Sequence, residues 1–193
     1  IILTSSTQAG CDNLYGKSKL SAEIAIKNLT DNTGNSSYIY RLPGVFGKWC
    51  KPNYNSVVAT FCHNISHDLP IQVNNPSFEL NLVYIDDVVE EFVKVTQGER
   101  DGEKELSVQP EYKIKLGDLA DQIKRFKESR DSLITEKVGS GLVRNLYSTY
   151  LSYLSPEQFS YLIPSYGDER GMFAEMLKTK DSGQFSFFTA KPG

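Results

Sequence analysis

Two short apolar runs flank a stretch of helical periodicity in the first 42 residues, and this order constrains the fold more than any other feature. The runs cover residues 1–3 and 38–42, which have the length and composition of strands. Between them, apolar residues recur at the spacing of one helix face, namely Ala22, Ala25, Ile26 and Leu29. This order predicts a strand–helix–strand unit of a parallel sheet, with its chemistry at the carboxyl ends of the strands.

A tyrosine and a lysine stand four residues apart where the predicted helix begins, just after a run of hydroxyl side chains. Because four residues make about one helical turn, Tyr15 and Lys19 share one face of the helix. An ammonium held near a phenol favours the phenolate, which makes the phenol a usable proton donor or acceptor near neutral pH. The hydroxyls of residues 5–7 could hold a substrate oxygen beside it. The combination indicates the proton-handling half of a site that interconverts carbonyl and alcohol groups.

Composition and charge exclude several classes of protein. The 193 residues are 39% hydrophobic, which suffices for a sizeable core. A net charge of −3 offers no basic surface for nucleic acid, and no apolar run approaches the about 20 residues that span a membrane. Cys11, Cys50 and Cys62 form no C-x-x-C pair, so we expect reduced thiols in a cytoplasmic protein.

Four motifs along the chain stand in the order found in a known family. They are Ser-Ser at 5–6, Tyr-Gly-Lys-Ser-Lys at 15–19, Arg-Leu-Pro-Gly-Val-Phe-Gly at 41–47 and Tyr-Ile-Asp-Asp-Val-Val at 84–89. Through them the chain resembles the extended short-chain dehydrogenase/reductases that act on nucleotide sugars, roughly over residues 1–130. The resemblance implies an α/β fold, the C-terminal half of a Rossmann-like doubly wound parallel sheet, and an NAD(P)-dependent oxidoreductase.

Two further segments, residues 46–56 and 146–154, narrow the resemblance. They are similar to the bifunctional capsule and O-antigen enzymes, in which a reductase domain is followed by a cupin domain. In that family the pair works on the pathway to UDP-N-acetyl-L-fucosamine. The resemblance implies that the reductase uses NADPH to reduce a 4-keto-6-deoxy-hexosamine nucleotide, after the cupin has inverted a neighbouring carbon.

The same resemblance divides the chain into two domains. Residues 1–154 are predicted to form the reductase domain without its N-terminal dinucleotide-binding half, since no G-x-G-x-x-G loop is present. Residues 155–193 are predicted to form the first β-strands of a truncated cupin domain. We therefore expect the chain to be an internal piece of a longer protein, unable to complete a cofactor pocket by itself.

Three catalytic residues follow from the resemblance. Tyr15 would protonate the C4 oxygen of the sugar as hydride arrives at the carbon, while Lys19 would favour the phenolate and reach the nicotinamide ribose. Ser6 is the predicted hydroxyl partner and Thr7 is the alternative, because successive strand residues point to opposite faces. The backbone of Pro43 would help to hold the nicotinamide ring, and an ordinary strand terminator is the alternative.

The substrate is predicted to be a UDP-linked amino sugar. Lys48, Asn53 and Asn55 lie in a loop whose donors could bind its diphosphate, and solvated loop residues are the alternative. NADPH is the implied cofactor and NADH the alternative, because the residues that read the ribose 2′ position lie outside this chain. The resemblance further implies a homodimer formed through the domain junction, and a cupin-bound metal only in the full-length protein.

Two other pairs of polar residues attract attention. His63 and His67 have the spacing of metal ligands on a helix, but without a third ligand in register we predict no metal site. Asp168 and Arg170, in the turn at 167–171, resemble residues of the sugar-nucleotide epimerase cupins, where the arginine would face the substrate phosphate. A simple surface turn is the alternative.

Periodicity and turn residues predict the remaining elements. Helices are expected over residues 56–67, 86–98 and 115–129, with Asp86 or Asp87 as the N-cap of the second and an apolar face of Leu116, Leu119, Ile123 and Phe126 on the third. Strands are expected over residues 69–73, 80–84, 106–108, 172–177 and 184–189.

Two alternatives to a ketoreductase remain open at the level of sequence. A 4-epimerase or 4,6-dehydratase would use the same Tyr and Lys, but a dehydratase needs an Asp-Glu pair where this chain has Thr7 and Gln8. A non-catalytic binding module is the second alternative. It would have no need for Ser6, Tyr15 and Lys19 together, and nicotinamide binding by the complete protein separates the two readings.

Overall fold

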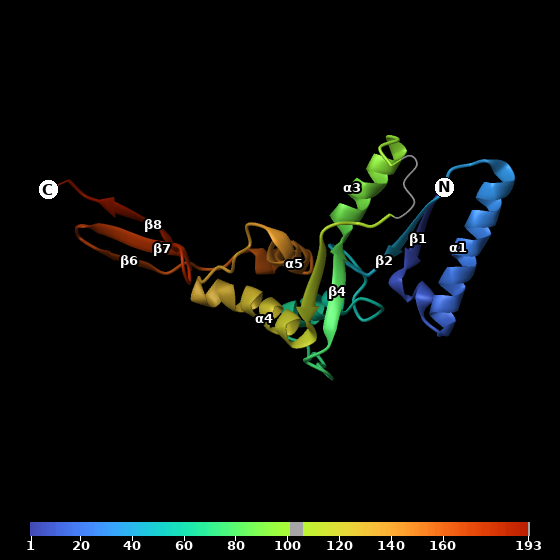
Figure 1. The fold of residues 1–193 in the computed structure, drawn as a ribbon. Coiled ribbons are helices and arrows are strands. Elements are labelled where there is room, and N and C mark those ends of the chain that lie inside the picture. Colours follow the sequence, from blue (N-terminus) through green and yellow to red (C-terminus); the bar gives the residue numbers. More distant parts are fainter. Residues whose placement is uncertain (101–105, 193) are drawn as a thin grey trace. The chain divides into compact units, whose positions relative to one another are not determined.

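The computed structural model describes residues 1–100 and 106–192, and it separates into two compact units. The first unit comprises residues 1–46 and 79–114, and the second comprises residues 47–78 and 115–193. Figure 1 labels the helices and strands of both units. The predicted domain boundary between residues 154 and 155 stays a prediction.

The predicted strand–helix–strand unit is present at the start of the first unit. Strand β1 (Ile2–Ser6) leads through the 3₁₀ turn η1 (Thr7–Gly10) into α1 (Leu14–Thr33), and β2 (Tyr38–Leu42) follows. The two strands pair in parallel, with Ile2 opposite Tyr38 and Ser6 opposite Leu42. Helix α1 runs alongside this pair (Figure 1) and contacts β1. The carboxyl ends of both strands therefore lie at one edge, as predicted.

Local sequence signals set both ends of α1. The side chain of Asn13 accepts a hydrogen bond from the Gly16 amide at 2.7 Å, which caps the first turn. Gly34 follows the last turn with φ +71°, a left-handed conformation that glycine adopts without steric cost. The helix is thus defined by its caps, although its apolar stripe is weak.

The apolar stripe predicted for α1 is only half right. Ala22 and Ile26 are half-buried, but Ala25 and Leu29 are exposed. The buried side chain on this helix is Glu23, an ionisable residue that a periodicity argument places outside the core. Strand β1 departs from the prediction in the same way, because its apolar residues are half-buried and Ser5 is its buried position. Apolar packing between β1 and α1 is therefore sparse in the described chain.

The larger apolar core of the first unit lies around a second sheet of order β3-β4-β5. Strands β3 (Gly44–Phe46) and β4 (Glu79–Tyr84) pair in parallel, and α3 (Ile85–Thr96) follows β4. The core combines side chains of β2, β4 and α3 with one from residue 108, namely Tyr40, Leu42, Val83, Val88, Val95 and Val108. Strand β5 (Glu111–Lys115) was not predicted, and the strand predicted over 106–108 is reduced to one bridge between Leu106 and Tyr40.

The N-cap predicted for α3 is wrong. Tyr84 occupies the cap position without a side-chain hydrogen bond, and Asp86 and Asp87 lie inside the first turn. Their negative charges still face the positive end of the helix dipole, which accounts for acidic residues at this place. Burial and the neighbouring carboxylates of Glu90 and Asp86 raise the pKa of Asp87 above its ordinary value.

The second unit is built on three helices that pack together: α2 (Val57–Ser66), α4 (Leu116–Ser132) and α5 (Gly141–Leu151). Their buried apolar residues include Val58, Phe61, Leu119, Ile123, Phe126, Leu146 and Tyr150. The periodicity of α2 and α4 predicted these buried faces correctly, and Ser56 caps α2. Helix α5 was not predicted, and residues 69–73 form no strand in the structure as described.

The end of the chain forms a three-stranded antiparallel sheet. A short 3₁₀ turn, η2 (Pro156–Phe159), precedes β6 (Ser165–Asp168), β7 (Gly171–Thr179) and β8 (Gly183–Ala190). Each strand pairs with the next, and a bulge interrupts the register of β7 between Glu175 and Leu177. The two strands predicted in this region are confirmed, each a few residues longer than expected.

Two sequence predictions concern the chain as a whole. Cys11, Cys50 and Cys62 are free thiols, and burial raises the pKa of the Cys62 thiol. Among the residues that the structure describes, no helix combines the length and the apolar composition needed to cross a bilayer.

Phe126→Ala should destabilise the helical core of the second unit. The Phe126 ring is buried and meets Tyr147 at 5.1 Å and Tyr150 at 6.0 Å between ring centroids. Removing it should lower the free energy of unfolding by about 3–5 kcal/mol, measured by urea denaturation. Leu162→Ala, at a side chain that is 94% exposed, is the control and should change it by less than about 0.5 kcal/mol. Equal effects of the two substitutions would contradict the described core.

Candidate active site

The predicted catalytic residues of the first unit gather where β1 passes into α1. Ser6 is the last residue of β1, and its Oγ accepts a hydrogen bond from the Gln8 amide at 3.2 Å. The Ser6 hydroxyl hydrogen is left available to a substrate oxygen. Tyr15 is the second residue of α1, and its side chain is 51% exposed. A phenol so placed is open to a substrate.

Lys19 lies one helical turn beyond Tyr15 on α1 and is half-buried. Its Nζ donates a hydrogen bond to the carbonyl of Thr4 on β1 at 3.1 Å. The same Nζ lies 5.7 Å from the centre of the Tyr15 ring. The ammonium is thereby held between the strand and the phenol ring.

The turn from β1 into α1 is tight, and Gly16 makes it possible. A Cβ atom at this position would lie 2.2 Å from the carbonyl oxygen of Gln8 and 2.6 Å from that of Cys11. Both contacts are with backbone atoms, which cannot rotate away. Glycine at position 16, directly after Tyr15, therefore allows η1 to pack against the first turn of α1.

A buried carboxylate on α1, which the sequence reading missed, joins the two strands. Glu23 Oε1 accepts a hydrogen bond from Ser5 Oγ at 2.5 Å, and the Arg41 guanidinium binds both carboxylate oxygens at 2.8 and 2.9 Å. Hydrogen bonding to Arg41 lowers the pKa of Glu23, and the smaller effect of the Ser5 hydroxyl acts in the same direction, while burial opposes them. The available signal was its position: Glu23 follows Tyr15 and Lys19 at two successive spacings of four residues.

Pro43 separates the two sheets of the first unit. It lies between β2, which pairs with β1, and β3, which pairs with β4. Proline has no amide hydrogen to donate to a sheet, so a strand break at this position is favoured. The predicted contact of its backbone with a nicotinamide ring stays a prediction.

The three residues predicted to bind substrate lie in the second unit. Asn53 and Asn55 line a cavity of 640 Å³ next to α2, together with Tyr54, Ser56, Val57, Thr60, Phe61, Asn64, Pro70, Ile71 and Gln72. Asn53 has φ 54°, and its backbone amide donates a hydrogen bond to Thr60 Oγ1 at 3.0 Å. Lys48 does not line this cavity, and its Nζ lies 5.8 Å from the centre of the Trp49 ring.

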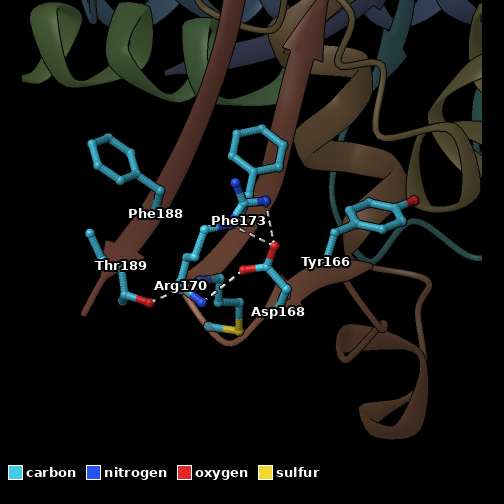
Figure 2. A pocket seen from close by; sticks show the side chains of 10 residues that line it. Tyr166, Asp168, Arg170, Phe173, Phe188 and Thr189 are labelled. Atoms are coloured by element: carbon cyan, nitrogen blue, oxygen red, sulfur yellow. Dashed lines mark hydrogen bonds and ion pairs between the residues drawn. The ribbon is translucent and has the colours of Figure 1, made fainter. Parts of the chain in front are cut away.

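A second cavity, of 570 Å³, lies on the C-terminal sheet (Figure 2). The side chains of Tyr166, Phe173 and Phe188 line it together with the turn that joins β6 to β7. In this turn the Arg170 guanidinium donates to Asp168 Oδ2 at 2.6 and 3.0 Å. The ion pair lowers the pKa of Asp168, and it occupies the arginine that was predicted to face a phosphate.

The two histidines of α2 stack on one another. The rings of His63 and His67 lie 4.4 Å apart at an angle of 22°, and the His63 Nδ1 lies 3.1 Å from Asn64 Oδ1. Outside residues 101–105 and 193, no three His, Cys, Asp or Glu side chains gather closely enough to hold a metal ion.

One protein-family model matches the segment that contains Ser6, Tyr15, Lys19 and Glu23. Residues 3–109 fit the NAD dependent epimerase/dehydratase family. The chain belongs to this family. A curated relative from Pseudomonas aeruginosa, named UDP-2-acetamido-2,6-beta-L-arabino-hexul-4-ose reductase, is 58% identical over 193 residues, which are 100% of this chain and 52% of the relative. The matched segment contains Ser6, Tyr15 and Lys19, whose catalytic roles stay predictions.

Solved structures agree with the family membership. The capsular polysaccharide assembling protein CapF from Staphylococcus aureus matches with a TM-score of 0.92 and 44% identity, over 100% of this chain and 53% of CapF. UDP-glucose 4-epimerase from Thermotoga maritima matches with a TM-score of 0.62 and 15% identity, over 82% of this chain and 64% of the epimerase. This second likeness shows the fold alone. The chain spans about half the length of the first two relatives.

Gly16→Ala should disturb the turn that carries the site of this family member. The new methyl group would overlap two backbone carbonyls, so the free energy of unfolding should fall by about 1–3 kcal/mol, as in other overpacked sites. Gly10→Ala is the matched control, because it adds a methyl group in the same turn with nothing within 4 Å. Thermal and urea unfolding of both variants measure the difference, and equal stability would contradict the described turn.

Glu23→Gln should change how stability depends on pH. The pKa of Glu23 is lowered in the folded state, so the unfolded chain binds the proton more tightly and stability rises with pH. The contribution is complete above the unfolded pKa of about 4.3 and is lost as the pH falls through the lower folded value. Urea unfolding between about pH 2.5 and 6 should show a flatter acid slope for Glu23→Gln. Glu128→Gln, at an exposed residue, is the control, and a slope unchanged by Glu23→Gln would contradict the buried pair.

Proposed function

We propose that the protein to which this chain belongs reduces the 4-keto group of a UDP-2-acetamido-2,6-dideoxy-hexos-4-ulose, in the synthesis of the capsular polysaccharide or O-antigen precursor UDP-N-acetyl-L-fucosamine. The observation that carries the proposal is the placement of Lys19 between the Thr4 carbonyl of β1 and the ring of the exposed Tyr15. The 58% identity to a reductase of such a sugar supports the same substrate class. As the chain spans half of that relative, the activity is proposed for the whole protein.

Tyr15 acts as the proton donor in this reaction. A nicotinamide cofactor, when bound, supplies the hydride for the carbonyl carbon. The phenol of Tyr15 gives its proton to the carbonyl oxygen, the C=O π bond breaks, and the product is an alcohol. Solvent then returns a proton to the phenolate, which the Lys19 ammonium stabilises in the meantime.

Ser6 and Lys19 orient the reacting groups. The Ser6 hydroxyl, anchored by its contact with the Gln8 amide, donates to the substrate oxygen and holds it beside the phenol. A reacting oxygen held in place lowers the entropic part of the barrier. Lys19 has further donor hydrogens beyond its bond to Thr4, and these are suited to the hydroxyls of a cofactor ribose.

NADPH is the proposed cofactor, with NADH as the alternative. The ammonium of Lys19 lies beside the ring of Tyr15. It could donate hydrogen bonds to the ribose hydroxyls of a nicotinamide cofactor while the phenol faces the substrate. Pro43, at the carboxyl end of β2, would contact the nicotinamide ring through its backbone. The family description, NAD dependent epimerase/dehydratase, supports a nicotinamide cofactor in general.

Asn53 and Asn55 are proposed to bind the sugar diphosphate, with Lys48 supplying positive charge. The 640 Å³ cavity that the two asparagines line has the size of a ligand site and offers several amide donors. We further propose that residues 155–193 begin a cupin domain, that any cupin metal belongs to the full-length protein, and that this protein is a cytoplasmic homodimer.

Tyr15→Phe in the full-length protein tests the proposal. The substitution removes the proton donor and leaves the ring, so the rate of NADPH oxidation by a UDP-4-keto-6-deoxy-hexosamine should fall about a hundredfold or more. Binding of NADPH should stay nearly unchanged. Tyr161→Phe is the matched control, since Tyr161 is also partly exposed beside a cation, with Arg130 at 5.2 Å from its ring. Wild-type turnover by Tyr15→Phe would exclude the proposed mechanism.

A further inference from the structure

Tyr15, Lys19 and Glu23 follow one another at four-residue spacings on α1 and differ in what they touch. Tyr15 is exposed, Lys19 reaches the backbone of β1, and Glu23 is 2% exposed and bonded to both strands. The family site uses the first two, whereas Glu23 meets neither cavity in the described chain. A buried ionised carboxylate is costly unless it is paired, and Glu23 is paired with both Ser5 and Arg41.

The partners of Glu23 stand next to residues of the candidate site. Ser5 precedes Ser6 on β1, and Arg41 lies two residues before Pro43 on β2. Ser5 and Arg41 are also opposite one another in the parallel register of the two strands. One carboxylate therefore ties α1 to both strands at a single level, one residue before β1 ends.

We propose that Glu23 is a positioning residue that sets the rotation and height of α1 on the β1–β2 pair, and so places Tyr15 and Lys19 over the end of β1. The inference rests on the proposed reductase function for its kinetic consequence. Glu23 acts through the helix, because its carboxylate is fully engaged by Ser5 and Arg41.

Directional bonds are needed here because apolar packing is weak. Ala25 and Leu29 of α1 are exposed, and β1 buries no apolar side chain completely. Non-directional burial of a few half-exposed methyl groups allows a helix to slide or rotate on a sheet. A bidentate pairing of a guanidinium with a carboxylate restricts both the sliding and the rotation of the helix, because its two parallel hydrogen bonds form in only one relative orientation of the two groups.

The first unit contains a matched control in Glu91 of α3. This carboxylate is 7% exposed, binds Arg100 through two hydrogen bonds of 2.7 and 2.9 Å, and accepts a third from the Tyr40 hydroxyl at 3.1 Å. It has the chemistry of Glu23, but Tyr40, Lys94 and Arg100, with which it pairs, lie on neither α1 nor β1. Loss of either carboxylate should cost similar stability, and only the loss of Glu23 should move the catalytic helix.

The kinetic test compares Glu23→Gln with Glu91→Gln in the full-length protein. Glutamine keeps the shape but places an amide donor against the donors of Arg41, which breaks the bidentate pair. At a temperature well below unfolding, Glu23→Gln should lower kcat at least about tenfold with the sugar KM within about threefold, because a displacement near 1 Å can cost a hundredfold. Glu91→Gln should lower the melting temperature comparably and leave kcat within about twofold of wild type.

Arg41→Lys provides a milder variant that should still fold. It keeps the positive charge and loses the planar fork, so a positioning role predicts most of the kcat loss seen with Glu23→Gln. If kcat in Glu23→Gln and Arg41→Lys stays within about twofold of that in Glu91→Gln, the positioning role is refuted.

A spectroscopic readout makes the inference testable even if the proposed reductase function fails. In protein labelled with 3-fluorotyrosine, the ¹⁹F resonance of Tyr15 is assigned by its loss in Tyr15→Phe. This resonance should shift in Glu23→Gln and keep its position in Glu91→Gln. A Tyr15 resonance unmoved in Glu23→Gln would overturn the positioning role. If the resonance shifts in Glu23→Gln but the wild-type protein oxidises no NADPH, the positioning role is retained and the reductase function is rejected.

Discussion

The parallel pairing of β1 with β2, bridged by the Glu23 carboxylate, is the constraint on which the candidate active site depends. Ser6 is the last residue of β1, and Tyr15 and Lys19 lie in the first two turns of α1. The distances between these side chains depend on where the helix lies along the strands. Asn13 and Gly16 shape the turn between β1 and α1. Two helical turns beyond Tyr15, Glu23 joins α1 to the strands. A few directional contacts thus do locally what a large apolar core does elsewhere.

In the rest of the first unit and in the helices of the second unit, burial of apolar side chains holds the elements together. Val83, Val88 and Val95 pack with β2 in one apolar cluster, and α2, α4 and α5 bury their faces against one another. Such cores tolerate exchange of similar side chains but specify orientation less sharply. Buried ion pairs occur in both settings, since Glu91 of α3 binds Arg100 beside the apolar cluster. On α1, where apolar packing is sparse, we infer that the pair of Glu23 with Arg41 supplies the orientation.

Where sequence patterns predicted the structure, the physical signal was local and repeated. The four-residue spacing of Tyr15 and Lys19 predicted their shared face, and the periodicity of α2 and α4 predicted their buried sides. The failures have a common cause. Residues 69–73 look like a strand, but a strand needs a neighbour to pair with, and β5 forms beside β4 despite an unremarkable composition. The cap of α3 was likewise misplaced, since acidic residues suit the first turn as well as the cap.

By itself, the sequence determined the order of strand, turn and helix, the shared helix face of Tyr15 and Lys19, and the resemblance that led to the family. These depend on spacing along the chain, which is readable without coordinates. Only the tertiary structure decided that Glu23 is buried, that Ser5 and Arg41 are its partners and that Asn53 and Asn55 line a cavity which Lys48 does not. Those facts depend on residues far apart in the chain meeting in space, such as Glu23 with Ser5 and Arg41, each 18 positions away, and no local pattern encodes such a meeting.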